Sequence, residues 1–353
     1  MRPSAAALYL IILACTGWTQ KPDDVLATAA GQTFRVSSLS PETQKDLIDL
    51  PAKIRQARLA LLDQMVSRRV FHAEAKARGI TIGKLLADEK AKIKDPVEAE
   101  IKKVLDANQD KLGGLTAEQA RKQVVAFLRN GPEQKALGDL YATLKVKYKV
   151  VPGKDVNLTD LTPTDAVTTI NGTPITAKEY EDFVSVPVYE GRAEIADAVL
   201  GELNDQIYSA VIIAEAKALG IDSSALIARE VSGKMKDYSD TERFALEEAL
   251  KAKLYPKYQV KILYPELVAP RQNISADDDP SLGPTAAPVT IIMFSDFQCS
   301  ACAAAHPVLK EAIAAYPGKI RFVVRDFPLE SIHADAFNAA KAANAANKQG
   351  KFF

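Results

Sequence analysis

Apolar residues recur every four positions along one stretch in the middle of the chain. They are Ile195, Val199, Leu203, Ile207 and Val211. A four-residue spacing places such residues on one face of a helix, and Gly220 beyond them is typical of a helix end. The pattern predicts a long helix whose apolar stripe packs against other helices, and a peptide-binding groove along the stripe is the alternative.

This pattern belongs to a repeat. Residues 73–80 and 214–221 share the order Ala-Glu-Ala-Lys-Ala and the final Gly-Ile, and they lie 141 positions apart. At the same spacing, residues 27–34 match residues 168–175. One spacing across separate matches indicates a duplication. The first copy also holds about 31 additional residues before its end.

Each copy opens with a β-prone segment that reaches a turn, at Gly31 in the first copy and at Gly172 in the second. A long helical pattern follows, which in the first copy stops at Gly79. The sequence therefore predicts two related, mainly helical modules at residues 23–152 and 163–265.

After the second copy the composition changes. Residues 266–287 are rich in Pro, Asp, Ser, Gly and Ala, which is typical of an exposed linker. This change predicts that residues 288–353 form a separate domain.

The final segment has the order strand, helix, strand. Residues 289–294 are β-branched or apolar, as in a buried strand. Residues 302–316 have a helical pattern, and residues 320–325 resemble a second strand. This order predicts a right-handed parallel βαβ unit. The predicted fold class is multidomain, with two helical modules before a small α/β domain.

Cys299 and Cys302 stand where that helix begins. A disulfide between them closes too short a loop to stabilise the fold, so the spacing favours chemistry. Unpaired amides and the dipole at a helix start stabilise a thiolate. Cys299 is therefore the predicted nucleophile, and Cys302, one turn further on, is the predicted resolving cysteine.

Asp296 and the histidines are the other polar residues whose role the sequence addresses. Asp296 either tunes the pKa of Cys299 or caps the helix, and the cap is favoured. A Cys-x-x-Cys pair is also half of a zinc site, to which His306 adds a ligand. A structural zinc site needs four ligands, however, and the sequence has no second Cys/His cluster. His306, His72 and His333 are thus expected to be surface or packing residues, and neither a metal nor a cofactor is predicted.

Residues 294–302, with Pro307 beyond them, resemble the active-site strand and helix of thioredoxin-fold oxidoreductases. Residues 326–329, 334–347 and 349–353 resemble the DsbA-like subgroup. The resemblance implies a protein disulfide oxidoreductase with a redox-active Cys299–Cys302 disulfide and a redox partner that recycles it.

The sequence departs from that family in two ways. Ser300 and Ala301 match neither the Pro-His of strong oxidants nor the Gly-Pro of thioredoxins, so the redox direction is open. The family fold continues with a cis-proline loop and closing strands, so residues 288–353 are expected to be a thioredoxin-like domain that is incomplete at its C-terminus.

The repeats, at about residues 25–150 and 165–265, resemble the N-terminal helical domain of SurA-like and PrsA-like chaperones. The second copy, from Ile170 to Thr176 onward, matches better. The resemblance implies binding of unfolded or cysteine-containing exported proteins. No stretch resembles the parvulin domain that often accompanies this fold, so prolyl isomerisation is not implied.

The N-terminus predicts export. Arg2 precedes an apolar run at residues 5–13, which is shorter than the roughly 20 residues needed to span a bilayer. This is the layout of a secretory signal over residues 1–20. Residues 12–15 also resemble a lipobox, which makes Cys15 a lipidation site as an alternative to simple cleavage. The predicted location is the periplasm, with membrane contact only through such a lipid.

The composition of the chain bears on which classes of partner it binds. Lys plus Arg and Asp plus Glu both number 45, so net charge favours neither nucleic acid nor an anionic membrane. The 47% hydrophobic residues are typical of a globular chain. The sequence predicts an exported disulfide oxidoreductase whose helical modules hold its substrate. The alternative is a periplasmic chaperone or peptide-binding protein with a redox-inactive or truncated thioredoxin-like domain.

Overall fold

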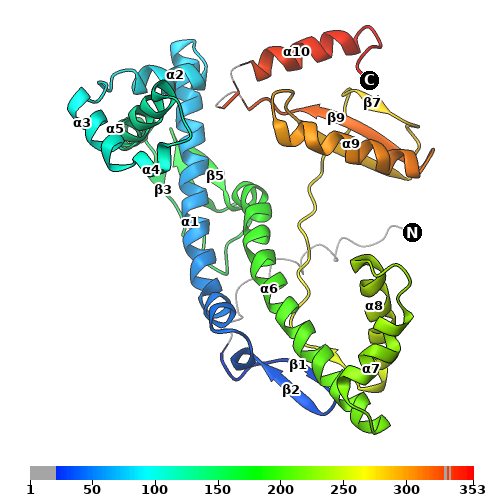
Figure 1. Cartoon of the computed structure of the whole chain (residues 1–353). Helices are drawn as coiled ribbons and strands as arrows, with labels where there is room; N and C mark the ends of the chain where they lie inside the picture. The colour runs from blue at the N-terminus through cyan, green and yellow to red at the C-terminus, as the bar shows by residue number, and fades with distance from the viewer. Residues whose placement is uncertain (1–20, 330–331, 334) are drawn as a thin grey trace, which may run out of the picture. The chain divides into compact units, whose positions relative to one another are not determined.

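A computed structural model describes residues 21–329, 332–333 and 335–353 (Figure 1). The predicted signal and Cys15 lie outside the described residues. The chain forms two compact units. Of the described residues, the first unit contains 21–70 together with Tyr141–Pro270, and the second lies within Phe71–Leu140 and Arg271–Phe353.

Two β-hairpins in the first unit repeat the sequence spacing. Strands β1 (Val25–Ala29) and β2 (Gln32–Arg35) form one antiparallel hairpin. Strands β4 (Ala166–Ile170) and β5 (Thr173–Thr176) form the other. Every strand end in the second hairpin lies 141 positions after its counterpart, so the duplication seen in the sequence is also present in the fold.

The long helices after the hairpins end at the same spacing. Helix α1 spans Pro41–Arg78 and helix α6 spans Ala177–Leu219. The apolar stripe of α6 is core. Its last four predicted members have no exposed surface and belong to one cluster of buried residues: Val199, Leu203, Ile207 and Val211. Ile195 is partly buried against that cluster. The packing prediction for the stripe is confirmed.

The hairpin turns place two residues each in the left-handed region. In the first turn φ is 51° at Ala30 and 74° at Gly31, and in the second it is 50° at Asn171 and 78° at Gly172. Two successive positive φ values define the type I′ turn, which favours Asn-Gly. Ala30 is therefore the strained position, because alanine has no side-chain hydrogen bond to compensate for this conformation.

Ala30→Asn is expected to stabilise the protein by about 0.5–1 kcal/mol, since asparagine tolerates positive φ better than alanine. Urea denaturation followed by circular dichroism measures the change. Asn171→Ala at the equivalent turn is the matched variant and is expected to destabilise the protein. An equal loss of stability in both variants would contradict this explanation.

The third strand of each sheet comes from the other copy. Strand β3 (Val151–Pro152) ends the first copy and pairs with β4 of the second. Strand β6 (Lys261–Ile262) ends the second copy and pairs with β1 of the first. The sheet orders are β2-β1-β6 and β3-β4-β5. The two copies therefore exchange strands reciprocally.

Hydrogen bonds at the turns show the same exchange. The amide of Ala30 donates to the carbonyl of Tyr258 over 3.0 Å, and the amide of Asn171 donates to the carbonyl of Tyr148 over 2.8 Å. One hydrophobic core cluster also combines β1 and β2 with α6, α7 (Ser223–Glu230) and α8 (Asp240–Lys257). The two related modules, residues 23–152 and 163–265, are thus joined, because each sheet takes strands from both copies.

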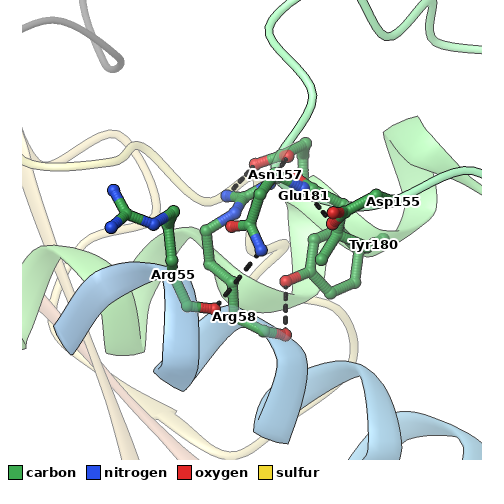
Figure 2. Close-up of polar contacts among 7 residues, drawn as sticks. Arg55, Arg58, Asp155, Asn157, Tyr180 and Glu181 are labelled. Carbon is green, nitrogen blue, oxygen red and sulfur yellow. Dashed lines mark hydrogen bonds and ion pairs between the residues drawn. The ribbon is translucent and has the colours of Figure 1, made fainter. Parts of the chain in front are cut away.

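Arg58 on α1 connects the copies through polar contacts (Figure 2). Its guanidinium forms an ion pair with Glu181 on α6 and donates to the carbonyl of Val156 over 2.6 Å. The hydroxyl of Tyr180 donates to the carbonyl of Arg58 over 2.7 Å. Burial raises the pKa of Tyr180, so this hydroxyl remains a donor at neutral pH. The contacts hold α1 against α6 and the loop at Val156.

The additional residues of the first copy lie in a stretch of helices, most of which belongs to the second unit. After α2 (Ile82–Lys90) come α3 (Glu98–Ala107), α4 (Gln109–Leu112) and α5 (Ala117–Lys147). The second copy has only α7, a short 3-10 turn and α8 at the corresponding place.

The final segment of the chain contains the predicted strand, helix and strand. Strand β8 (Val289–Ser295) runs parallel to β9 (Ile320–Asp326), and α9 (Ser300–Ala315) connects them. Helix α10 (Ala336–Asn347) follows. The parallel strand pairing is confirmed.

Two predictions for this part were wrong. A short strand, β7 (Ser281–Leu282), pairs with β9 inside the predicted linker. Asp279, just before this strand, also forms an ion pair with Arg325 of β9 over 2.6 Å. The linker therefore ends before Asp279. Strand β8 is not buried, since Val289 is 51% and Phe294 44% exposed. In the described part of the chain β9 is the central strand and β8 pairs with it on one side only.

Candidate redox site

Cys299 is the N-cap residue of α9, with an extended backbone at φ −79° and ψ 117°. Its amide donates to the carbonyl of Asp296 over 3.1 Å, and its carbonyl accepts from the amide of Ala303 over 3.1 Å. Cys299 and Cys302 are free thiols and both are half-buried. The local sequence thus places the first sulfur at the open end of a four-turn helix.

Hydrogen bonds from the helix start lower the pKa of the Cys299 thiol. The backbone amide of Cys302 contributes most, followed by the Cys302 thiol, and the amide of Ala301 adds to them. Partial burial and the negative charge of Asp296 act in the opposite direction. Because donors at a helix N-terminus favour the charged form of sulfur, the net effect is a more acidic thiol.

Asp296 does not cap α9, which corrects the favoured prediction for this residue. Its carboxylate accepts from the amide of Gln298 over 2.7 Å and from the amide of Leu329 over 2.8 Å. It also lies 2.8 Å from Nδ1 of His333. Cys299 occupies the N-cap position itself, so the Asp296 side chain binds its own turn and the segment after β9 instead.

Asp296 is a buried charge, with 4% of its surface exposed. Burial acts to raise the pKa of its carboxyl, but hydrogen bonds from His333 and from the amides of Gln298 and Leu329 outweigh burial and lower it. The carboxylate is therefore ionised at neutral pH. It faces the cysteine turn as a fixed negative charge.

His333 is the site residue that sequence reasoning missed. The sequence favoured a surface or packing role, whereas the structure makes it the partner of Asp296, 37 positions away. A buried carboxylate requires a hydrogen-bond donor, but the burial of Asp296 is a property of the fold that the sequence pattern did not indicate. Local spacing did not show which histidine supplied it.

Aromatic side chains lie on both sides of the cysteine turn. Phe297, two residues before Cys299, is 50% exposed and meets Phe352 edge to face, with ring centroids 6.2 Å apart. Phe294 and Phe327 form a similar pair at 6.2 Å. The segment before Cys299 therefore carries two half-exposed aromatic side chains, Phe294 and Phe297.

Among the residues that the structure describes, no group of three or more His, Cys, Asp or Glu side chains is placed to hold a metal ion. His306 lies on α9, after Cys302. Over the same described residues, no helix is both long and apolar enough to cross a bilayer.

Comparison with known proteins agrees with the fold of this segment. Residues 275–353 match the family model described as Thioredoxin. Together with the parallel β8–β9 pair and the cysteines at the start of α9, this match defines a thioredoxin-like segment. The match begins before residue 288, as the pairing of β7 also requires.

Curated relatives share a short stretch with this chain. The Na(+)/H(+) antiporter NhaA 3 of Salinispora tropica is 40% identical over 80 residues, which are 23% of this chain and 12% of the antiporter. The NhaA 1 antiporter of Salinispora arenicola has the same identity and coverage. That of Mycolicibacterium vanbaalenii is 38% identical over 80 residues, 13% of its length. The chain thus covers about an eighth of these relatives, and no solved structure matches it.

Proposed function

We propose that this protein is an exported, DsbA-like thiol–disulfide oxidoreductase that acts on protein dithiols and disulfides. Cys299 is the nucleophile and Cys302 the resolving cysteine. The observation that carries the proposal is the position of Cys299 at the N-cap of α9, where the amides of Ala301 and Cys302 lower the pKa of its thiol.

The reaction proceeds by two exchanges of sulfur bonds. The Cys299 thiolate attacks one sulfur of a substrate disulfide, which forms a mixed disulfide and releases the other substrate sulfur as a thiolate. Cys302 loses its proton and attacks Cys299, which forms the Cys299–Cys302 disulfide and frees the second substrate thiolate. The substrate gains two electrons and the cysteine pair loses two. The reverse sequence oxidises a substrate dithiol, and a redox partner then restores the pair.

The helical part is proposed to bind unfolded or cysteine-containing exported chains. A hollow of about 340 Å³ in the first unit supports this role. Its walls come from α1 and α6 and are mainly apolar, including Leu50, Ile54 and Val188, with Asp46 and Lys53 at the polar side. Such a surface suits an extended apolar segment.

The proposed location is outside the cytoplasm, after cleavage of the signal or lipidation of Cys15. The second candidate function is a periplasmic chaperone or peptide-binding protein in which the cysteine pair is inactive, and the hollow between α1 and α6 favours it independently of the thiols. Ion transport is not proposed, because the similarity to the antiporters covers only 12–13% of their length.

The test is a redox titration of the purified chain in glutathione buffers, with alkylation and mass spectrometry of the cysteine peptides. We expect one two-electron couple between about −270 and −120 mV, the range of thioredoxin-fold enzymes. The chain is also expected to accelerate thiol exchange with a dithiol peptide above glutathione alone. Cysteines that stay reduced in every buffer, with no acceleration, would favour the chaperone function.

A further inference from the structure

Four hydrogen bonds hold the segment after β9 against the cysteine turn. The amide of Phe327 donates to the carbonyl of Ser295, and the amide of Leu329 donates to the carboxylate of Asp296, both over 2.8 Å. Two more bonds of 2.8 Å follow, from His333 to the Asp296 carboxylate and from the amide of Asp335 to the side-chain oxygen of Gln298. Only the bond from His333 uses a side-chain donor of that segment.

The protonation of this pair follows from its chemistry. An ionised carboxylate only accepts hydrogen bonds, so Nδ1 of His333 carries the hydrogen that lies between the two side chains. The Asp296 side chain is 1% exposed, so water does not replace that donor. The imidazole therefore fixes the position of the carboxylate, and its N–H partly compensates the negative charge that acts on the cysteine turn.

We propose that His333 is a positioning residue for the redox site: through its Nδ1 hydrogen bond to Asp296 it limits how strongly that carboxylate opposes the Cys299 thiolate. Among the residues that the structure describes, the other titratable side chains on the cysteine turn and on the segment after β9 are Cys299 itself, Cys302, Asp326 and Asp335. Asp326 accepts from the side-chain amide of Asn344 on α10. Asp335 contributes its backbone amide to Gln298.

The direction of the effect follows from the remaining contacts. Without the imidazole, the amides of Gln298 and Leu329 still bind the carboxylate, so Asp296 stays ionised at neutral pH. Its charge is then compensated by two donors in place of three, and a nearby like charge disfavours the Cys299 thiolate. Loss of His333 should therefore make the Cys299 thiol less acidic.

The inference rests on the proposed function only in taking Cys299 as the reactive thiol. Its test measures the titration of the Cys299 thiol and not the turnover of a substrate. A negative result therefore contradicts the role of His333 without contradicting the proposed function. In the full chain, the alkylation rate of Cys299 by iodoacetamide is measured from pH 4 to 10 by mass spectrometry. His333→Leu is expected to raise the midpoint by about 0.5–1 pH unit, and each unit corresponds to tenfold less thiolate below the midpoint.

Three further variants separate positioning from a general loss of structure. His333→Asn supplies an amide N–H near the position of Nδ1 and is expected to recover at least half of the shift. Asp296→Asn removes the opposing charge and should lower the midpoint. Adding His333→Leu to Asp296→Asn should then cause no further shift, because the two residues act as one coupled pair. His72→Leu, at an exposed position on α1, is the control and should leave the midpoint unchanged.

Two outcomes would overturn the proposal. One is an unchanged Cys299 midpoint in a folded His333→Leu variant, which would reduce His333 to a structural contact. The other is the same shift in the Asp296→Asn background, which would show that His333 acts independently of the carboxylate. Near-ultraviolet circular dichroism of each variant confirms that the compared proteins are folded.

Discussion

Cys302→Ala is expected to accumulate mixed disulfides through Cys299, while Cys299→Ala is expected to accumulate almost none. The structure places Cys299 at the N-cap of α9, where amides of the helix start lower the pKa of its thiol. Cys302 lies one turn into the helix and is the group that would release a trapped partner. Non-reducing electrophoresis after acid quenching, followed by mass spectrometry of the adduct, measures the difference.

We expect at least a tenfold excess of adduct in Cys302→Ala over Cys299→Ala, because the thiolate is the attacking species. Ser300→Ala is the matched control. It changes one of the two residues between the cysteines but keeps both thiols, so it should trap no more partner than the unmodified protein. Equal trapping by both cysteine variants would contradict the assigned roles. Trapping by neither variant would favour the chaperone function.

Separation of the repeats is expected to abolish folding of both. Strand β3 of the first copy completes the sheet of the second, and β6 of the second copy completes the sheet of the first. A polypeptide of residues 23–152 lacks β6 and the helices that bury its hairpin. A polypeptide of residues 163–265 lacks β3. Each fragment therefore leaves sheet edges and apolar side chains uncovered.

The segment 23–265 is the reference, and we expect it to unfold in one cooperative transition and to suppress aggregation of an unfolded client. Each fragment alone should lose most of its cooperative transition by circular dichroism. An equimolar mixture should recover that transition, because the exchanged strands are then both present. Two fragments that fold independently, each with its own midpoint, would contradict the reciprocal exchange.

The sequence determined the local features of this protein. A four-residue apolar repeat in α6, glycine at two turns and one spacing of 141 residues were sufficient to predict the long helices, the turns before them and the duplication, but not the second strand of each hairpin. In the thioredoxin-like segment, the order of β-branched and helical patterns placed Cys299 at a helix start. These features depend on backbone preferences and on amphipathic periodicity, both of which act between residues close in sequence.

Only the tertiary structure decided which elements are partners. The pairing of β6 with β1 joins residues more than 200 positions apart, and no periodicity distinguishes it from pairing within one copy. The same holds for the bond between Asp296 and His333, and for the central place of β9 beside the half-exposed β8. Strand pairing and buried hydrogen bonds depend on which groups remain unpaired once the chain has packed. That condition belongs to the whole fold, so local sequence determines the elements while packing determines their partners.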